Sequence, residues 1–529
     1  MAKAETGGAA KNVLMATNVI ERSILLLLIY LSFLLEITFV RNHNGNMIIN
    51  VFSSISLLIY LSIVLVPLGI SMMLNLPNRP WLDELSSIMA MIGFNIILIE
   101  FWLSGRVKSL SKVLGIDWVL QVHQLFARTA LVFLLIHPFM YTLPIQPAWM
   151  MNSSHQDFLG LSLASGLTGM LSLFALITLV GLAIMRKSSD LSYEAWRLSH
   201  MILALVIASV GFFHTIDAGR YAQEVWMRSY WQFMLGLALL SLAWTYVIKP
   251  LIQNKNAHEV TSIKQVSLKI WELVIKHSMA KKMDYQAGQF AWLKIGSSSP
   301  TPENPFSIAS CSHQDSSEIK FLIKDVGDFT HQISQLQIGQ KAFVDAPYGN
   351  FGAEAFSVEH DQLVMIAGGV GIAPMISVLR QIERDQDTKV LAKKILLIYG
   401  NRVAEQAINL KEMVNLASFK NLEVVQLVSE PRDDWQGHTG VLDRSTLEKI
   451  LSTHQINLKS AQFMICGPAE MIDSVEISLD KFGAPLANIA SEKFQYDFGK
   501  MNPKNKRSVI SALLGTAALL AVAIYGALH

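Results

Sequence analysis

Two apolar stretches decide the fold of this chain: WVLQVHQLFARTALVFLLIHP at 118–138 and WRLSHMILALVIASVGFFHTI at 196–216. Each stretch holds two histidines 14 residues apart, which are His123 and His137 in the first and His200 and His214 in the second. At about 100° per residue, 14 residues end about 40° short of four helical turns, so both rings of a pair leave one face of a helix, about 21 Å apart. The spacing therefore predicts two helices that each carry one histidine near either end.

Packed side by side, these helices would place a facing histidine pair near each edge of a hydrocarbon core about 30 Å thick. A single histidine in an apolar helix is commonly a satisfied core residue or a pore-lining group, but two pairs with one spacing favour a shared role as metal ligands. Zinc is disfavoured because each level offers only two imidazoles, whereas a haem needs only two axial ligands. We predict two stacked bis-histidine haems, of b type because the chain has no C-x-x-C-H motif.

The composition predicts a membrane half and a soluble half. Of 529 residues, 52% are hydrophobic and 16% are charged, and the mean hydropathy of +0.37 is too high for an ordinary soluble protein. A net charge of +2 gives no support for nucleic-acid binding. Cys311 and Cys466 both lie in the polar half, which argues against a disulfide framework or a cysteine metal cluster and favours a reducing compartment.

Eight apolar segments are long enough to span a membrane: 23–40, 51–73, 84–103, 119–141, 160–185, 198–216, 230–250 and 508–528. Basic residues precede both histidine helices and the last span, whereas 138–185 contains no Lys or Arg. The two histidine helices should therefore run from the cytoplasm outward, with His123 and His200 at the inner level. Seven spans before the soluble half would place the N-terminus outside, against the basic residues Lys3, Lys11 and Arg22, so the first span fits this orientation least well.

The soluble half changes pattern twice. From about 257 to 355, short β-prone runs separated by Gly, Pro, Ser and Asn predict a small β-barrel. From about 361, strand-like runs alternate with helical segments, which predicts a parallel α/β sheet. Three strands of that sheet end in candidate ligand-binding turns: Gly368, Gly369, Gly371 and Pro374; Asn401 and Arg402; and Cys466, Gly467 and Pro468. Glycines there would let backbone amides approach a pyrophosphate, at the edge where open α/β sheets bind ligands.

Two further motifs flank a strand of the predicted barrel that contains Lys324. They are Asn304-Pro305-Phe306-Ser307 and Gly327-Asp328-Phe329-Thr330, and DAPYGNFG follows at 345–352. Taken alone, each would be interpreted as a turn. In this order, and after the four histidines, they resemble the motifs of the ferric reductase and NADPH oxidase superfamily, in which a di-haem membrane domain is fused to a ferredoxin-reductase-like FAD and NAD(P) module. The resemblance covers about 50–499.

This resemblance implies a multi-domain membrane protein with an α-helical di-haem bundle, a cytoplasmic FAD-binding β-barrel and an α/β NAD(P)-binding domain. The last apolar span adds a C-terminal transmembrane helix to this expected fold. The implied division is an N-terminal tail at 1–22, an accessory transmembrane helix at 23–45, a six-helix di-haem domain at 46–254, the FAD-binding barrel at 255–356, the NAD(P)-binding domain at 357–499, and a basic linker with the last helix at 500–529. The expected location is multi-pass in a cell membrane, the inner membrane of a bacterium.

The resemblance also implies residue roles. The metal ligands would be His123, His137, His200 and His214, and the candidate catalytic residues would be Ser307, near the flavin N5, and Cys466, beside the nicotinamide. Phe306 would pack on the flavin ring, and Phe494 resembles an aromatic residue near the flavin. The full set of candidate cofactor-binding residues is Asn304, Pro305, Phe306, Ser307, Lys324, Gly327, Asp328, Phe329, Thr330, Gly368, Gly369, Gly371, Pro374, Asn401, Arg402, Cys466, Gly467, Pro468 and Phe494.

Several positions depart from the family pattern. The family usually has Arg or His where this chain has Asn304, so the expected cation for the FAD pyrophosphate is missing, and Lys324 or the backbone of 327–330 could replace it. Family members commonly end near Phe494. The final span at 508–528 is therefore an added feature, which we predict to be a membrane anchor; the alternative is a surface helix, because Gly515 and many alanines lower its hydrophobicity.

The acceptor is predicted from a second departure. The oxidases of the family share an arginine in the first core helix and a further histidine four residues after the outer ligand of the first histidine helix. Here 51–78 contains no arginine and the second position is Tyr141. This favours transfer of electrons from NAD(P)H, through FAD and two haems, to an extracytoplasmic ferric chelate. The alternatives are superoxide production from oxygen, and electron supply to a separate redox partner.

The nucleotide is predicted to be NADPH rather than NADH. Arg402 follows the second strand of the α/β sheet, and a guanidinium suits a ribose 2′-phosphate. No acidic residue follows that strand immediately to claim a free 2′-hydroxyl. Asn401 is also a candidate nucleotide-binding residue, and the alternative interpretation is that it only closes a turn.

Overall fold

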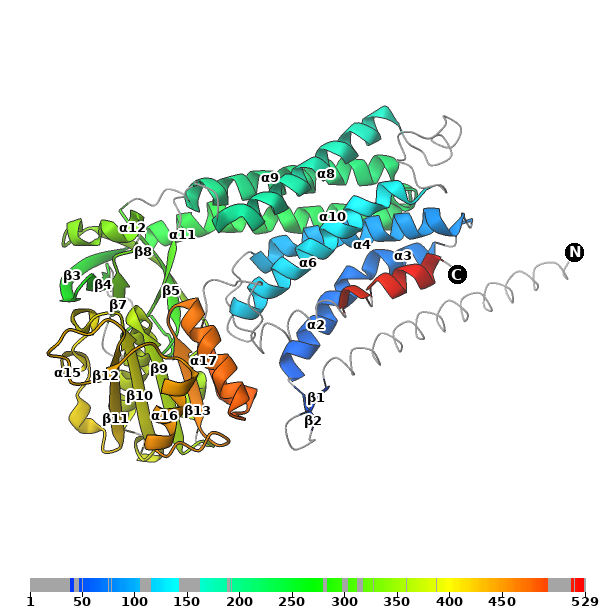
Figure 1. Ribbon diagram of the computed structural model, residues 1–529. Helices are drawn as coiled ribbons and strands as arrows, with labels where there is room; N and C mark the ends of the chain where they lie inside the picture. Colours follow the sequence, from blue (N-terminus) through cyan, green and yellow to red (C-terminus); the bar gives the residue numbers. More distant parts are fainter. Residues whose placement is uncertain are drawn as a thin grey trace, which may run out of the picture. The chain divides into compact units, whose positions relative to one another are not determined.

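The computed structural model describes the chain in these ranges: 39–41, 47–49, 51–74, 76–77, 79–104, 116–141, 162–187, 191, 193–278, 283–296, 303–311, 317–326, 328–357, 359–386, 388–492, 515–517 and 519–527. The chain forms two compact units (Figure 1). One comprises 1–107, 120–245 and 508–529, and its described part is mainly helical. The other comprises 108–119 and 246–507, and it holds two six-stranded sheets.

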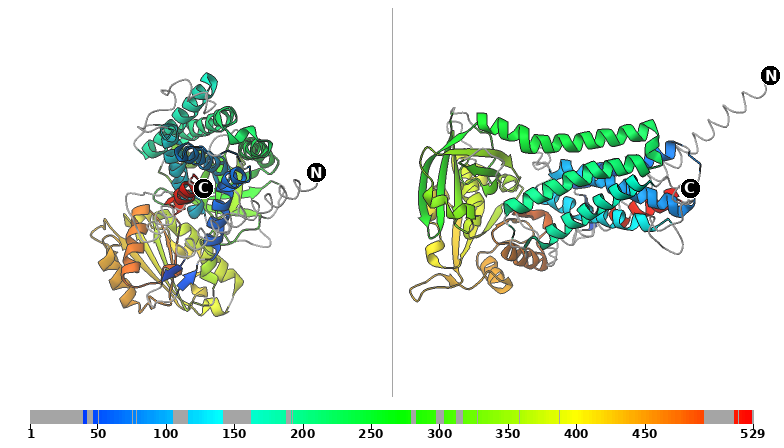
Figure 2. Two further views of the ribbon diagram at one scale, coloured as in Figure 1. Left: turned by 90° about the vertical axis from the view of Figure 1, so that its right-hand side faces the viewer. Right: turned by 90° about the horizontal axis from the view of Figure 1, so that it is seen from above.

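The helical unit is built from long apolar helices. They are α2 (Val51–Val64), α3 (Val66–Met73), α4 (Trp81–Ser104), α6 (Ile116–Ile136), α8 (Leu163–Ile184), α9 (Tyr193–Ala218) and α10 (Val225–Ala243). Among the described residues, five helices are long and apolar enough to cross a membrane, and a sixth span is possible if the bent pair α2–α3 counts as one. Helix α9 packs along α8 and also contacts α10 (Figure 2).

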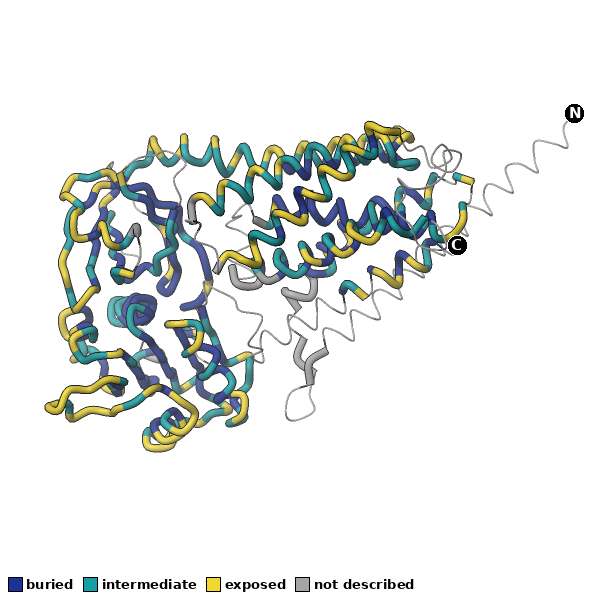
Figure 3. The backbone as a smooth tube through the Cα atoms, turned by 45° about the horizontal axis from the view of Figure 1, so that its top comes forward, coloured by how far each residue is buried: buried dark blue, intermediate teal, exposed yellow. Residues whose placement is uncertain are grey.

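Helix α4 lies at the centre of this bundle. Of its most apolar 18-residue window, 83% is buried, whereas the corresponding windows of the other four candidate spans are 6–28% buried (Figure 3). Large apolar side chains such as Phe174 and Phe213 are instead exposed on the outer helices. An apolar exterior around helices that satisfy their own backbone hydrogen bonds is what a hydrocarbon environment requires.

The span predicted as one helix at 51–73 is wrong in one respect, because it is broken. Helices α2 and α3 meet at Leu65 with a bend of 43°. Pro67 causes the break, since proline has no N–H to donate to the carbonyl of Ile63 one turn earlier. The side chain of Asn95 on α4 replaces that donor, with its Nδ2 donating to Ile63 O at 2.9 Å and Val64 O at 3.1 Å. The Asn95 side chain thereby satisfies two carbonyls at the break.

The accessory helix predicted at 23–45 is also partly wrong. Phe39–Arg41 (β1) is a strand, and it pairs antiparallel with Met47–Ile49 (β2). The intervening NHNGN sequence is rich in turn-forming residues, which favours a hairpin over a continuing helix. The tail at 1–22 and the remainder of that helix up to residue 38 lie outside the described residues.

The last helix, Gly515–Ala527, packs within the helical unit. Its 13 residues would extend about 20 Å, which is shorter than the predicted span of 508–528, but 508–514 lie outside the described residues. Leu519, Val522 and Ala523 are buried. A Cβ on Gly526 would lie 3.3 Å from side-chain atoms of both Ile88 on α4 and Leu68 on α3, so this glycine allows close helix packing.

The first sheet of the second unit is an antiparallel barrel, preceded by α11 (Lys249–Lys255). Its strands are β3 (His258–Ser267), β4 (Ile270–His277), β5 (Phe290–Ile295), β6 (Asn304–Ser307), β7 (Glu318–Lys324) and β8 (Lys341–Tyr348). The spatial order is β6-β5-β8-β3-β4-β7, and a bridge between Ile308 and Phe321 joins the two ends. Alternating apolar residues such as Leu273, Leu293 and Phe321 fill its interior, as the β-prone pattern predicts.

The second sheet is parallel. Its strands are β9 (Gln362–Gly368), β10 (Lys394–Asn401), β11 (Leu422–Val428), β12 (His438–Thr439), β13 (Gln462–Cys466) and β14 (Ile489–Glu492), in the spatial order β12-β11-β10-β9-β13-β14. Helix α13 (Ile372–Asp385) packs on one face, and α16 (Arg444–Thr453) and α17 (Ala469–Lys481) pack on the other. The strand order reverses between β9 and β13, so the crevice where such sheets bind ligands opens between the ends of these two strands.

The barrel and the parallel sheet are joined by hydrogen bonds from α13. Arg380 donates to the carbonyl of Ala309 at 2.8 Å, and the Ser377 hydroxyl donates to that of Ser310 at 2.7 Å. Arg380 also lies 3.6 Å from the carboxylate of Glu272 on β4. These contacts hold the segment after β6 against the helix that follows the glycine-rich turn.

Candidate redox site

The four predicted histidines form two facing pairs in the helical unit. The ring centres of His123 and His200 lie 6.4 Å apart, and those of His137 and His214 lie 6.5 Å apart. A metal–nitrogen bond of about 2.0 Å and about 1.1 Å from nitrogen to ring centre would put two opposed imidazoles on one metal about 6.2 Å apart. The donor set and its spacing at both levels therefore fit an axially ligated haem. Among the described residues, no cluster of three or more His, Cys, Asp or Glu offers a different metal site.

The Nδ1 atoms of three of these rings already have hydrogen-bond partners. His137 Nδ1 lies 2.7 Å from the carbonyl of Leu134, and His214 Nδ1 lies 2.8 Å from that of Ser165. His123 Nδ1 lies 2.7 Å from Glu100 Oε2. Acceptors at Nδ1 orient each ring and favour the tautomer in which Nε2 can bind a metal. The Nδ1 of His200 is buried without a hydrogen-bond partner among the described residues, and the ring contacts Trp196.

A glycine on α8 makes room for His214 in the His137–His214 pair. A Cβ on Gly169 would lie 2.7 Å from His214 Cε1 and 2.8 Å from its Nδ1, distances that real side chains do not tolerate. Any larger residue at 169 would displace the ring. The spacing of the histidines predicts that they share a helix face. The space for the His214 ring at Gly169 depends instead on the packing of α8 against α9.

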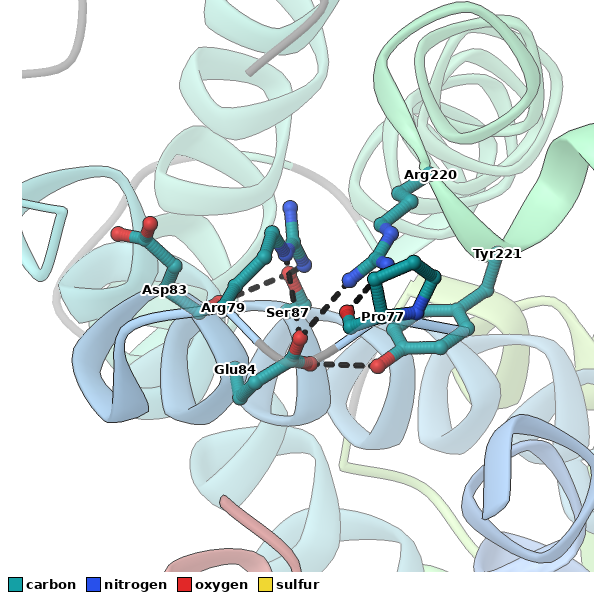
Figure 4. A network of polar contacts seen from close by, with 7 residues as sticks. All are labelled: Pro77, Arg79, Asp83, Glu84, Ser87, Arg220 and Tyr221. Atoms are coloured by element: carbon teal, nitrogen blue, oxygen red, sulfur yellow. Dashed lines mark hydrogen bonds and ion pairs between the residues drawn. The ribbon is translucent and has the colours of Figure 1, made fainter. Parts of the chain in front are cut away.

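An ion-pair network that the sequence alone did not predict lies at the end of α4 nearest His137 (Figure 4). Glu84 accepts from Arg79 at 3.1 Å and from Arg220 at 3.0 Å, and it also accepts from the Tyr221 hydroxyl at 2.5 Å. Arg220 follows α9, so the network connects the end of the helix that carries His214 to the beginning of α4. The Ser86 hydroxyl donates to the carbonyl of His137 at 2.6 Å, which attaches the other histidine of this pair to the same region of α4.

Arg79 and Tyr141, which bear on the choice of electron acceptor, also lie in this region. The sequence has no arginine in 51–78, but the next residue is Arg79. Its guanidinium donates to Glu84 and, at 2.9 Å, to Ser87. The Tyr141 side chain interacts with Ser86 and Ser87 and lies within electrostatic range of Arg79. A cation and a phenol therefore lie together at the level of His137.

The predicted nucleotide-binding turns lie together at the crevice of the parallel sheet. Gly368 ends β9, Gly369 and Gly371 form the following 3₁₀ turn, and Pro374 lies in the first turn of α13. A Cβ on Gly371 would collide with the carbonyl of Cys466, and a Cβ on Gly368 would lie 2.8 Å from Pro468 Cδ. The two turns thus pack backbone to backbone, which only glycines permit.

The barrel contributes Lys324 to this crevice. Its Nζ lies 3.8 Å from the position of a Cβ on Gly369, so the ammonium group approaches the glycine-rich turn. The predicted loss of a cation at Asn304 is therefore accompanied by a cation at the end of β7. This position suits Lys324 to a phosphate held at that turn.

The predicted flavin motif forms β6 of the barrel. Asn304, Pro305, Phe306 and Ser307 pair with β5, and Ser307 is opposite Phe290. The Phe290 ring stacks with Tyr348 at 5.8 Å. Thr330, of the second motif, accepts from the backbone N–H of Val326 at 2.9 Å. Gly327, the side chains of Asp328 and Phe329, and Phe494 lie outside the described residues.

Glu492 is a further candidate that the sequence prediction missed. It is the register partner of Cys466 between β14 and β13, and it is 5% exposed. Its Oε1 lies 3.2 Å from the position of a Cβ on Gly349, which also contacts Phe290. A buried carboxylate thus connects Cys466 to the region of Ser307. In a single sequence, nothing distinguishes a polar residue such as Glu492, at the end of a short strand, as a site residue.

Arg402, which follows β10, pairs with a carboxylate that is distant in the sequence. Its Nε donates to Glu430 Oε2 at 2.9 Å, and Glu430 follows the neighbouring strand β11. Asn401, the last residue of β10, is buried. The predicted nucleotide selector is therefore paired with a carboxylate, although none follows β10 immediately in the sequence.

Three family models match successive parts of the chain. The ferric reductase like transmembrane component matches 86–211, the FAD-binding domain matches 258–369, and the oxidoreductase NAD-binding domain matches 365–476. The first range includes His123, His137 and His200, and it ends three residues before His214.

Individual relatives match part of the chain. NADH-cytochrome b5 reductase 1 of Candida glabrata is 30% identical over 169 residues, which are 31% of this chain and 56% of that protein. The reductase component of propane 2-monooxygenase of Mycolicibacterium smegmatis is 25% identical over 240 residues, which are 45% of this chain and 66% of that protein. The chain thus spans about half to two thirds of the length of these relatives.

Among solved structures, a ferredoxin NADP+ reductase from Neisseria gonorrhoeae with bound FAD and NADP is 21% identical, covers 45% of this chain and 97% of its own, and has a TM-score of 0.39. The family models, in contrast, cover the helical bundle, the barrel and the parallel sheet in turn. The chain therefore belongs to the ferric reductase and NADPH oxidase superfamily, as a membrane protein with a fused FAD- and NAD-binding oxidoreductase module.

Proposed function

We propose that this chain carries electrons from cytoplasmic NAD(P)H, through FAD and two b-type haems, to an extracytoplasmic ferric chelate. The observation that carries the proposal is the pair of histidine levels, at which the ring centres of the two histidines lie 6.4 and 6.5 Å apart. Three of the four rings have an acceptor at Nδ1, which leaves Nε2 available as a ligand. The presence of two such levels in one bundle supports transfer across a membrane rather than at one surface.

The residues of the second unit would bind and orient the nucleotide and the flavin. The turns at Gly369 and Cys466 would receive the pyrophosphate and the nicotinamide of NAD(P)H, and Lys324 would neutralise phosphate charge. Ser307 would orient the flavin through a hydrogen bond. When bound, FAD accepts a hydride and releases electrons singly, and the haems carry them across the bundle.

The direction of electron transfer across the membrane affects its free energy. Moving one electron outward against a negative-inside potential costs about 2.3 kcal/mol per 100 mV. The two histidine levels must therefore provide environments of different redox potential. The protein can arrange this through hydrogen bonding to the ligands and through burial.

The acceptor is tested with the purified full-length chain, FAD and NAD(P)H. We expect NAD(P)H oxidation to accelerate on addition of ferric citrate, with formation of ferrous iron and little change on addition of superoxide dismutase. Oxidation that requires oxygen and yields a superoxide-dismutase-sensitive product would favour an oxidase instead. If neither ferric citrate nor oxygen supported NAD(P)H oxidation, and a membrane extract restored it, the result would favour electron supply to a separate partner.

Haem ligation is tested by substitution. His137→Leu should remove the outer haem and leave the inner one, so the haem content should fall from two to about one per chain, because a haem is held by its two axial ligands. Haem content is measured as the pyridine complex. His438→Leu, on the exposed short strand β12, is the matched control and should keep both haems. Full haem content in both His137→Leu and His214→Leu would exclude the assignment.

Superoxide production is the second candidate function. Arg79 and Tyr141 favour it, because they lie together at the level of His137, where an oxygen-derived anion would form. Against it, the Arg79 guanidinium already donates to Glu84 and Ser87. If oxygen is the acceptor, Arg79→Gln should lower superoxide formation more than ferric citrate reduction.

A further inference from the structure

The two histidine levels differ in what their Nδ1 atoms contact. At the outer level the acceptors are neutral backbone carbonyls, those of Leu134 and Ser165. At the inner level, His123 Nδ1 lies 2.7 Å from the carboxylate of Glu100. Hydrogen bonds to an ionised acceptor are roughly twice as strong as bonds between neutral groups. The two levels are therefore chemically unequal although their ring spacings are the same.

Glu100 occupies a site that is built to hold it. It lies in the most buried helix, α4, and is 5% exposed. Its Oε1 accepts from the Tyr60 hydroxyl at 2.7 Å and its Oε2 faces His123. A carboxylate within a membrane span is costly and is retained mostly where it has a function. Two donors from two other helices give this one a defined position.

The direction of the hydrogen bond follows from ligation. A histidine that binds iron through Nε2 carries its proton on Nδ1, so Nδ1 donates and Glu100 accepts. A carboxylate acceptor draws that proton away and makes the ring a stronger electron donor to the metal. A stronger donor stabilises ferric over ferrous iron, which lowers the reduction potential. Carbonyl acceptors have the same effect only weakly.

We propose that Glu100 is a positioning residue that sets the reduction potential of the inner haem below that of the outer haem. The proposal rests on the proposed function, because it requires haems at both levels. It would make electron transfer downhill from His123 and His200 toward His137 and His214. The difference offsets part of the cost of moving charge outward against the membrane potential.

The path of the chain supports entry of electrons at the Glu100 level. Helix α10 precedes α11 and the barrel in the sequence, and near its last turn the Ser241 hydroxyl donates to the carbonyl of Phe101 at 2.7 Å. Phe101 is the residue after Glu100. The last residues of the bundle before the barrel in the sequence therefore lie at the level of Glu100 and His123.

The far side of this site is covered by apolar groups. The Tyr60 ring lies 4.7 Å from that of Phe126 on α6, and Phe126 is 2% exposed. A Cβ on Gly515 of the last helix would lie 3.6 Å from Phe126 Cζ. Such a cover keeps the local dielectric low, which strengthens the effect of the Glu100 charge on its neighbours.

The test measures the midpoint potentials of both haems in the full-length protein by optical redox titration. Glu100→Gln keeps the size and the hydrogen-bonding groups but removes the charge, and it should raise the potential of the inner haem. We expect an at least tenfold shift in the electron-sharing equilibrium between the haems, which for one electron is about 59 mV. The inner haem is identified by repeating the titration in His137→Leu, which retains only that haem.

Two variants serve as comparisons. Glu84→Gln is the matched control, because Glu84 is also a carboxylate of α4 that accepts from a tyrosine, Tyr221, but among the described residues it has no hydrogen bond to a histidine. The electron-sharing equilibrium should change less than about twofold, which for one electron is about 18 mV. Tyr60→Phe removes the hydroxyl that shares the Glu100 carboxylate with His123 Nδ1. The hydrogen bond from His123 should then strengthen, and the reduction potential of the inner haem should fall. Opposite shifts in Glu100→Gln and Tyr60→Phe are not expected from structural disturbance alone.

The outcomes separate the two proposals. A shift confined to the outer haem, an equal shift of both, or no shift in Glu100→Gln would overturn the role of Glu100 while two haems remain bound. Fewer than two haems in the unsubstituted protein would instead refute the proposed function. Loss of the inner haem in Glu100→Gln, with the outer haem kept, would show a role in ligation only and would also overturn the proposal.

Discussion

The pairing of Arg402 with Glu430 decides how the nucleotide preference should be tested. A guanidinium favours a 2′-phosphate, whereas a carboxylate favours a free 2′-hydroxyl. Glu430→Gln should free Arg402 and raise the ratio of kcat/KM for NADPH over NADH about 5- to 10-fold, equivalent to about 1 kcal/mol. Arg402→Ala should lower the same ratio. Glu405→Gln, another exposed carboxylate paired with an arginine, should leave it unchanged. An unchanged ratio in both test variants would mean that other residues select the nucleotide.

The histidine pair at the start of the barrel predicts acid sensitivity. The rings of His258 and His277 lie 4.8 Å apart on paired strands. Burial, and then the neighbouring His277, lower the pKa of His258 to about 4. Between about pH 6.5 and 4 the unfolded chain binds a proton that the folded barrel does not bind, so stability present above this window decreases as the pH falls through it. From pH 7 to 5 the loss should be on the order of 2 kcal/mol.

Thermal release of flavin from the full-length chain, followed by its fluorescence, measures this effect. The transition temperature should fall between pH 7 and pH 5, and His258→Gln should reduce that fall. His438→Gln, in an exposed strand, is the control. An equal decrease with and without His258 would assign the acid sensitivity to other groups.

At the scale of the element, the last helix should stabilise the bundle. Thr516 Oγ1 lies 2.8 Å from Thr129 Oγ1 on α6, and Gly515 faces Phe126. Truncation after Asp497 removes these contacts, so we expect both haems to bind but the detergent-solubilised bundle to lose haem faster on heating. Because the same truncation removes a tether between the nucleotide domain and the bundle, NAD(P)H turnover should change too.

A substitution separates the packing from the tether. Gly526→Leu would force Ile88 and Leu68 apart while the chain remains covalently attached. It should reproduce the faster haem loss and not the change in turnover. Ala521→Leu, on the exposed side of the helix, is the control. If the truncated protein behaved like the full-length chain in both assays, the helix would have neither role.

At the scale of the whole molecule, the orientation of the bundle makes a prediction about sidedness. The last helix runs from Phe126, near the middle of α6, toward Ile88, near the His137 end of α4. If the His137 level faces outward, a tag after His529 should be reachable only from outside the cell. Protease added to inverted membrane vesicles should then leave the tag intact and remove the nucleotide-binding domain. Cleavage of the tag in inverted vesicles would contradict this topology.

Much of this protein was determined by short-range sequence patterns. The apolar spans, the 14-residue histidine spacing and the glycines at strand ends each depend on residues close together in the chain, so helical or strand geometry alone places them. Both histidine pairs, the barrel and the parallel sheet were predictable for that reason. The hairpin at Phe39–Arg41 was missed because apolar content outweighed the turn signal that follows it.

Only the tertiary structure decided which distant polar groups meet. Helix packing brings Glu100 to His123 and Asn95 to the break before Pro67. The order of the strands brings Glu430 to Arg402. These contacts join positions 23 to 32 residues apart on different elements, and one sequence contains no periodic signal for them. The charge at the inner histidine level, the counter-ion of the candidate nucleotide selector and the hydrogen bonds at the broken helix follow from packing, because burial requires each polar group to find a partner wherever the fold provides one.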